Sequence, residues 1–155
     1  MKKGFTIVEI IIVIAVIVAA LVAILGFFAF EARVAERGRM SLEAISFAEE
    51  AIEAVRNFRD NTTWTSNGIG VLTTGIDYHP ASSSTGWNII SGSETINEFT
   101  RKIIFNKVYR DANDNISDSG TEDSNTRKVI VTVSWADRQG SVNESLITYI
   151  TNWRE

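Results

Sequence analysis

The first thirty residues contain one long apolar segment. It runs from Phe5 to Phe30, which is 26 residues, and its one charged side chain is Glu9. As a helix it would be about 39 Å long at about 1.5 Å per residue, whereas the hydrocarbon core of a bilayer is about 30 Å thick. The apolar stretch of a secretory signal peptide is only about 7–15 residues long. The pattern therefore predicts one transmembrane helix over residues 5–30, with the two lysines before it keeping its start in the cytoplasm.

Residues 31–60 have a different pattern and are rich in Ala, Glu and Arg. Their larger apolar residues recur mostly at offsets of three, seven and ten: Val34, Leu42, Ile45, Ile52 and Val55. This spacing places them on one stripe of an amphipathic helix, with charged side chains on the other faces. No proline interrupts the run, so we expect one continuous helix from about residue 6 to about residue 59, whose second half packs on a globular head.

Three later segments alternate apolar and polar residues, as half-buried strands do. They are residues 98–110, 127–136 and 144–153. The alternation slips between Phe105 and Val108, which indicates a β-bulge. We expect a small antiparallel three-stranded sheet, one face of which buries the helix stripe. Residues 61–97 are predicted to be mostly loop with short extended pieces, so residues 61–155 form the head of an α+β protein with a long N-terminal helix.

Composition narrows the possible functions. A chain of 155 residues is long enough for one modest domain. It has no cysteine, which excludes disulfides and thiolate metal sites, and its single histidine, His79, excludes a multi-histidine metal site. The net charge of −4 gives no indication of a nucleic-acid partner. No group of side chains suggests a catalytic centre, so we do not expect an enzyme.

Glu9 is the unusual residue of the apolar segment. A carboxylate inside a transmembrane helix costs roughly 2.5–3.5 kcal/mol on insertion scales. One interpretation places Glu9 close to the lipid headgroups, where the cost is small. The other gives it a partner in the membrane, namely a positive charge on a neighbouring chain.

The N-terminal string KKGFTIVE, followed by about twenty apolar residues, resembles the N-terminus of type IV pilins and pseudopilins. The resemblance implies that residues 1–4 are a leader, which a prepilin peptidase removes on the cytoplasmic side by cutting between Gly4 and Phe5. Phe5 then becomes the N-terminal residue and is N-methylated. Glu9 matches the family's glutamate that pairs with the N-terminal amine of an adjacent subunit during assembly. The later stretch FAEEAIEAVRNFRD is similar, more loosely, to PilV-type minor pilins.

The same resemblance implies a structural subunit of a type IV pilus or of a type II secretion pseudopilus. Its expected partners are other pilin or pseudopilin subunits, the prepilin peptidase and methyltransferase, the inner-membrane assembly platform and membrane lipid. Before assembly the chain would cross the inner membrane once, and afterwards it would belong to a surface or periplasmic filament. A minor pilin or pseudopilin is favoured, because Gly26 stands where many major pilins have a proline and the cysteine pair of many major pilins is missing.

A different class of function stays open. The N-terminus could be a leader-like anchor for an extracytoplasmic ligand-binding or enzymatic domain, in which case the leader would stay uncut.

The acidic segment from residue 111 to residue 123 is a possible calcium loop. Asp111, Asn113, Asn115 and Glu122 fall at positions 1, 3, 5 and 12 of such a loop. Position 6, where the loop needs glycine, is Ile116, and the flanking segments are predicted strands rather than helices. A solvated hairpin loop is the other interpretation. No other cofactor is expected.

Overall fold

The structure is a computed structural model that describes residues 6–84, 86–138 and 140–153. The chain divides into two compact units, Met1–Met40 and Ser41–Glu155. One helix, α1 (Ile7–Asn61), belongs to both units, and all of the strands belong to the second. From here on, the head means this second unit, which adds the C-terminal part of α1 to the expected residues 61–155.

The bounds of α1 follow from local hydrogen bonds at both ends. At its start, the Glu9 N–H donates to the Thr6 hydroxyl over 3.3 Å, as expected where threonine caps a helix. At its end, the Asn61 side-chain amide donates to the Asn57 carbonyl over 2.9 Å, and the Thr62 hydroxyl donates to the Phe58 carbonyl over 2.6 Å. The predicted single helix is therefore confirmed, with ends close to those expected.

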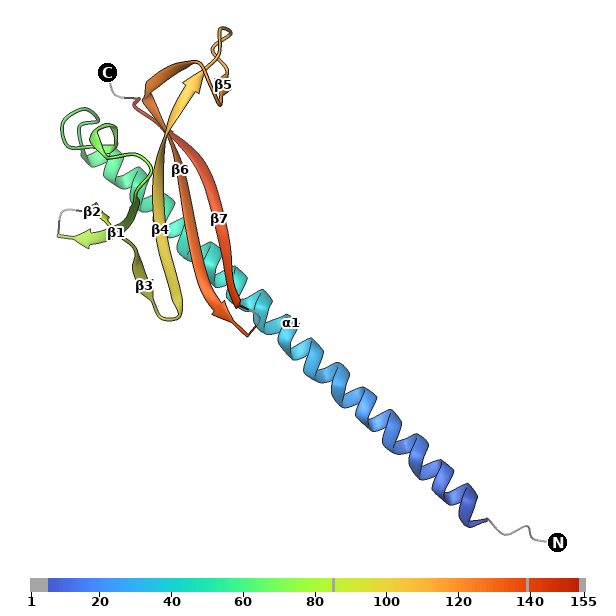
Figure 1. Cartoon of the computed structure of the whole chain (residues 1–155). Helices are drawn as coiled ribbons and strands as arrows, with labels where there is room; N and C mark the ends of the chain where they lie inside the picture. The colour runs from blue at the N-terminus through green and yellow to red at the C-terminus, as the bar shows by residue number, and fades with distance from the viewer. Residues whose placement is uncertain (1–5, 85, 139, 154–155) are drawn as a thin grey trace. The chain divides into compact units, whose positions relative to one another are not determined.

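Among the described residues, the sheet of the head has seven strands rather than three, so the expected three-stranded sheet is wrong. Five of them lie in the order β2-β1-β4-β6-β7, while β3 and β5 both pair with β4. All of the pairings are antiparallel, and the bounds are β1 (Asp77–Ser83), β2 (Gly86–Ser91), β3 (Glu94–Ile96), β4 (Phe99–Arg110), β5 (Ile116–Ser117), β6 (Thr121–Asp137) and β7 (Gly140–Thr151). Figure 1 shows β4, β6 and β7 running side by side.

The four additional strands come from segments that read as loop in the sequence. Strands β1, β2 and β3 lie within residues 61–97, and β5 lies in the acidic segment. Few of their side chains are fully buried, so the sequence shows little of the apolar alternation that marks a strand. Their backbone groups are nevertheless paired with the neighbouring strands. His79, for example, lies in β1 opposite Ile90 of β2.

The β-bulge is confirmed. The register of β4 against β6 shifts between Lys107 and Val108. Beyond this point the end of β4 pairs with the beginning of β6 and also with β5, so that a hairpin arm extends from the sheet. Figure 1 shows this arm at the β5 label.

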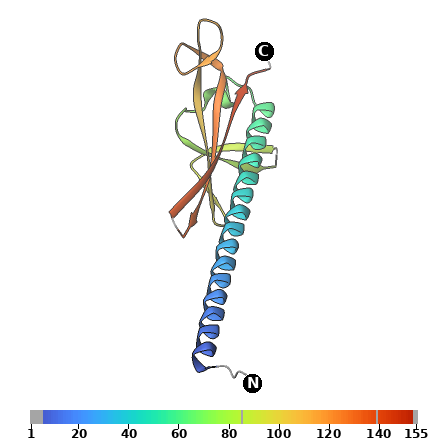
Figure 2. The same ribbon diagram turned by 90° about the vertical axis from the view of Figure 1, so that its right-hand side faces the viewer.

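The core of the head lies between one face of the sheet and the last turns of α1. The sheet contributes the large side chains, of which Phe105, Ile103, Val129, Val131 and Val133 are fully buried. Fully burying a side chain of this size contributes about 1.5–3 kcal/mol. Figure 2 shows the helix and the sheet as two layers of the head.

The face of α1 that packs on the sheet differs from the predicted stripe. Its fully buried residues are mostly small, namely Ala44, Ala48, Ala51, Ala54 and Val55. Leu42, which was predicted to lie on the stripe, is 71% exposed. Alanine lets the helix backbone approach the sheet closely, because the large side chains of the sheet already fill the space between the layers.

Arg101 of β4 is buried in this core, with an exposed fraction of 2%. Its guanidinium donates to the Phe47 carbonyl of α1 over 2.8 Å and to the Glu94 carboxylate of β3 over 2.8 Å. The Glu50 carboxylate of α1 lies 3.5 Å away. Arg101 therefore joins three elements of the head, and its charge is compensated, as a buried charge requires.

The first unit consists of the helical residues 7–40 among those described. Large apolar side chains cover this part of α1 and are exposed, from Ile7 at 78% to Phe30 at 61%. The part of the chain that the structure describes has one helix long and apolar enough to cross a membrane, and it is α1. The composition of this surface suits contact with lipid better than contact with water.

Candidate functional site

The first candidate site is the beginning of α1. Gly4 and Phe5, the residues on either side of the expected cut, lie outside the described residues. Thr6 and Glu9 are described, and they form the pattern Thr-x-x-Glu at the start of a helix. In such a capping box the threonine hydroxyl accepts a hydrogen bond from the backbone of the glutamate, as it does here. The first turn of a helix also favours negative charge, because the helix dipole is positive there.

The carboxylate of Glu9 has no partner among the described residues. Glu9 contacts Thr6 through its backbone N–H, and its side chain is exposed beside Ile7, Val8, Ile10 and Ile12. A carboxylate in this position can accept hydrogen bonds from a cation brought by another molecule. Glu9 is therefore consistent with two roles, capping its own helix and binding a positive group in trans.

Gly26 lies in the apolar part of α1, where the helix continues without a break. A Cβ atom added to Gly26 would meet nothing within 4 Å. Among the described residues, no close contact requires glycine at this position. Gly26 therefore does not interrupt the helix.

The calcium candidates lie in the hairpin arm. The Asp111 carboxylate accepts hydrogen bonds from the backbone N–H groups of Asn113 (2.8 Å) and Asn115 (2.9 Å). The hydrogen bond from the Asn115 N–H, followed by the one from the Asn113 N–H, is the main reason why the pKa of Asp111 lies below its ordinary value. Glu122 lies in β6 and forms an ion pair with Lys107 over 2.7 Å. The structure therefore brings Asp111, Asn113 and Asn115 together in one turn and directs Glu122 toward β4.

The carboxylates of Asp111 and Glu122 are already engaged within the chain. Among the described residues, no group of three or more acidic or histidine side chains is arranged to hold a metal ion. A bound calcium ion would have to compete with the backbone N–H groups for Asp111 and with the Lys107 ammonium for Glu122. The geometry favours the hairpin-loop interpretation.

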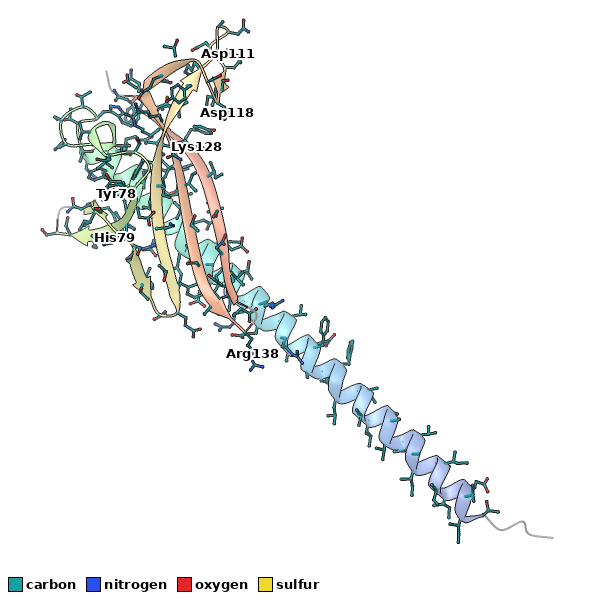
Figure 3. The ribbon with its side chains drawn as sticks, viewed as in Figure 1. Tyr78, His79, Asp111, Asp118, Lys128 and Arg138 are labelled. Carbon is teal, nitrogen blue, oxygen red and sulfur yellow. The ribbon has the colours of Figure 1, made fainter. Side chains whose placement is uncertain are left out.

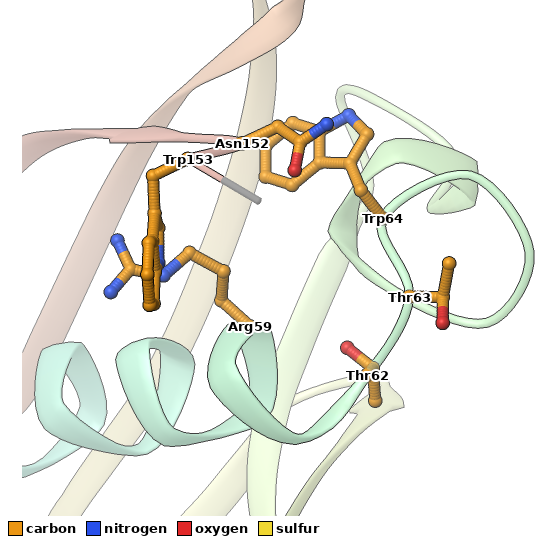
Figure 4. Close-up of a pocket in the computed structure, with 6 residues that line it drawn as sticks. All are labelled: Arg59, Thr62, Thr63, Trp64, Asn152 and Trp153. Atoms are coloured by element: carbon orange, nitrogen blue, oxygen red, sulfur yellow. The ribbon is translucent and has the colours of Figure 1, made fainter. Parts of the chain in front are cut away.

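A hollow of about 140 Å³ lies where α1 ends, between the helix and the residues after β7. Figure 4 shows its lining residues, with the guanidinium of Arg59 beside the Trp153 ring at 5.9 Å from the ring centroid. Arg59 also pairs with Asp60 over 2.8 Å, and Trp64 donates to the Ser124 carbonyl over 3.0 Å. These contacts are internal, so they stabilise the end of the helix and use the polar groups that a ligand would need.

A second hollow, of about 190 Å³, lies at the end of the sheet that carries β5. It is lined by polar and aromatic side chains of four strands and of the residue after β5, including Asn106, Tyr109, Ser117, Asp118, Lys128 and Tyr149. Figure 3 shows Asp118 and Lys128 at this end of the head. Sequence reasoning missed this group, because its members are distant in sequence and meet only through the strand register. The one signal in the sequence is that Asn106, Lys128 and Tyr149 belong to predicted strands and Asp118 to the acidic segment.

No protein-family model matches this chain, and neither a curated protein nor a solved structure matches it. The classification of the chain therefore depends on its own residues and geometry.

Proposed function

We propose that this protein is a structural subunit, a minor pilin or pseudopilin, of a type IV pilus or a type II secretion pseudopilus. The observation that carries the proposal is the carboxylate of Glu9 on the exposed apolar part of α1, five residues after a glycine preceded by two lysines. The long apolar helix and the compact antiparallel head are consistent with a subunit that is anchored in the membrane before assembly.

The proposed maturation creates a positive charge with which the Glu9 carboxylate can pair. A prepilin peptidase cuts between Gly4 and Phe5, and Phe5 is N-methylated. The formal side-chain charge falls from −4 to −6, because the leader takes Lys2 and Lys3 with it. The new amine at Phe5 carries one positive charge, which can pair with Glu9 of the next subunit.

The physical reason for this pairing is the cost of an uncompensated charge. A carboxylate in an apolar surrounding is costly unless it has a partner. An amine from a neighbouring chain removes this cost and fixes the axial position of the two subunits. The contact is head-to-tail, so its repetition produces a helical filament unless the rotation closes.

The proposed test separates the charge of Glu9 from its role in helix capping. Glutamine keeps the capping-box geometry but removes the charge. In cells that assemble the filament, we expect Glu9→Gln and Glu9→Ala to be processed normally and both to be missing from sheared filaments. The measurement is an immunoblot of the filament fraction against the membrane fraction.

The matched control is Thr6→Ala, which removes the helix cap and keeps the carboxylate. We expect this variant to enter filaments. Relative to the original chain, its amount in filaments should fall by no more than its amount in the membrane falls. Normal incorporation of Glu9→Gln would contradict the pairing, and it would leave helix capping as the role of Glu9.

A further inference from the structure

The second hollow of the head is built by the strand register and the bulge. Asn106 of β4 lies opposite Lys128 of β6, and Lys128 lies opposite Tyr149 of β7, so the three side chains form a row across the sheet. Lys128 alternates with the buried Val129, so the row lies on the face turned away from the core. Beyond the bulge, Ser117 of β5 pairs with Tyr109 of β4, which places β5 at the edge of the hollow.

Several polar side chains of this hollow have no partner among the described residues, although Lys107, which also lines it, and Arg110 are paired. Lys107 pairs with Glu122, and Arg110 pairs with Asp123 over 2.8 Å. Across the described ranges, by contrast, the side chains of Asn106, Lys128 and Asp118 form no hydrogen bond or ion pair. Those of Ser117 and Tyr149 form none with these residues either. Lys128 and Asp118 carry opposite charges and line the same hollow without forming an ion pair, so both remain available to a ligand.

We propose that this hollow binds one pyranose ring of a saccharide. Asn106, Ser117, Asp118 and Lys128 together offer both donors and acceptors, which is what the hydroxyl groups of a sugar require. Tyr149, which is 42% exposed, offers an aromatic ring to the apolar C–H face of the sugar. A purely anionic ligand is disfavoured by Asp118, and a purely cationic one by Lys128.

The size of the hollow sets the size of the bound unit. Its volume is about 190 Å³, which is below the ~300–1,000 Å³ of sites for drug-sized ligands. The hollow therefore takes no more than about one sugar ring, and the rest of an oligosaccharide would extend into solvent. A ligand of this size binds weakly, with a dissociation constant on the order of 1 mM. This inference does not depend on the proposed filament role.

The test uses the full chain in phosphocholine micelles, because glycoside detergents would compete for the site. Saturation-transfer NMR is recorded with three trisaccharides, namely maltotriose, chitotriose and trigalacturonate, and with inorganic phosphate as the anion probe. We expect saturation transfer to at least one trisaccharide and no binding of phosphate. Asp118→Asn, which changes an exposed loop residue, and Tyr149→Ala are expected to weaken binding about tenfold or more.

The matched controls lie outside the hollow. Trp153→Ala removes an exposed aromatic side chain and Lys102→Gln removes a lysine of β4. Neither residue lines the hollow, so both variants should leave binding unchanged. Three results would overturn the proposal: no saturation transfer at tens of millimolar saccharide, transfer that Asp118→Asn and Tyr149→Ala leave intact, or binding of phosphate in place of saccharide. Circular dichroism of each variant shows whether the head is folded.

Discussion

At the scale of single residues, Arg101 is the most deeply buried charged side chain that the structure describes. Its guanidinium is almost completely buried and is compensated by Glu94, Glu50 and the Phe47 carbonyl. We expect Arg101→Ala to lower the free energy of unfolding by about 3 kcal/mol, because it leaves a cavity and an unpaired carboxylate. Urea unfolding followed by tryptophan fluorescence measures the change.

The control for Arg101 is Arg56, whose ion pair with Glu53 lies on the surface of α1. Arg56→Ala should change the free energy of unfolding by less than about 1 kcal/mol. Equal effects of the two substitutions would show that the buried network does not stabilise the head.

Asp123 makes the stability of the hairpin arm depend on pH. Its burial alone would raise the pKa, but hydrogen bonds from Arg110, Thr126 and the Asn125 N–H outweigh this and lower the pKa below the ordinary value of 3.8. A carboxyl whose pKa is lowered by folding stabilises the fold above its unfolded pKa, and this contribution is lost as the pH falls through the folded pKa. The loss attributable to Asp123 is therefore expected below pH 3.8.

The measurement for Asp123 is the unfolding free energy between neutral pH and pH 2, by urea titration. Asp123→Asn should be less stable than the original chain at neutral pH, and its stability should fall less steeply in acid. Asp114→Asn is the control, because Asp114 is 84% exposed. Parallel pH profiles for the original chain and Asp123→Asn would contradict the assignment.

At the scale of elements, substitutions of Gly26 test whether the apolar half of α1 packs closely against a neighbouring helix. The helix is continuous there, and an added Cβ would meet no atom of the described part of the chain within 4 Å. Gly26→Ala should therefore be tolerated. Alanine also favours the helical conformation over glycine by about 1 kcal/mol. We expect Gly26→Leu to reduce the amount of the subunit in filaments, because its bulk obstructs close packing with a neighbouring helix.

Quantitative immunoblotting of sheared filaments compares the two Gly26 variants at equal membrane levels. If both enter filaments as well as the original chain, no neighbouring helix packs closely at Gly26. If Gly26→Ala is already excluded, the position requires glycine for a reason other than bulk.

The sequence predicts the elements whose signal is periodic. The helix and the strands β4, β6 and β7 follow from apolar spacing, and the bulge follows from the slip between Phe105 and Val108. Strands β1, β2, β3 and β5 were missed, because their pairing depends on backbone groups rather than on side-chain alternation. Leu42 was misplaced because alanine, rather than the larger residues, forms the face that packs on the sheet.

The candidate sites also differ in how far the sequence predicts them. The beginning of α1 is predictable, because its residues lie within one short motif that includes Gly4, Phe5 and Glu9. The hollow beside β5 is not, because Asn106, Lys128 and Tyr149 meet only when the strand register is known. A sequence pattern shows local periodicity and does not show which residues of different strands lie side by side.

At the scale of the whole molecule, the chain joins an apolar helix to a head with its own core. The head can fold by burying one face of the sheet against the alanine-rich face of α1. The apolar residues of the first unit remain exposed and need lipid or other helices to cover them. In the proposed account, lipid covers them before assembly and neighbouring subunits cover them in the filament.

The central claim is that the chain is processed as a prepilin. The most direct measurement is the intact mass and N-terminal sequence of the protein extracted from membranes of cells with an active prepilin peptidase. The account predicts a chain that has lost residues 1–4 and begins at Phe5 carrying one added methyl group. A chain that still begins at Met1 under these conditions would contradict it, and the protein would then be an anchored extracytoplasmic domain.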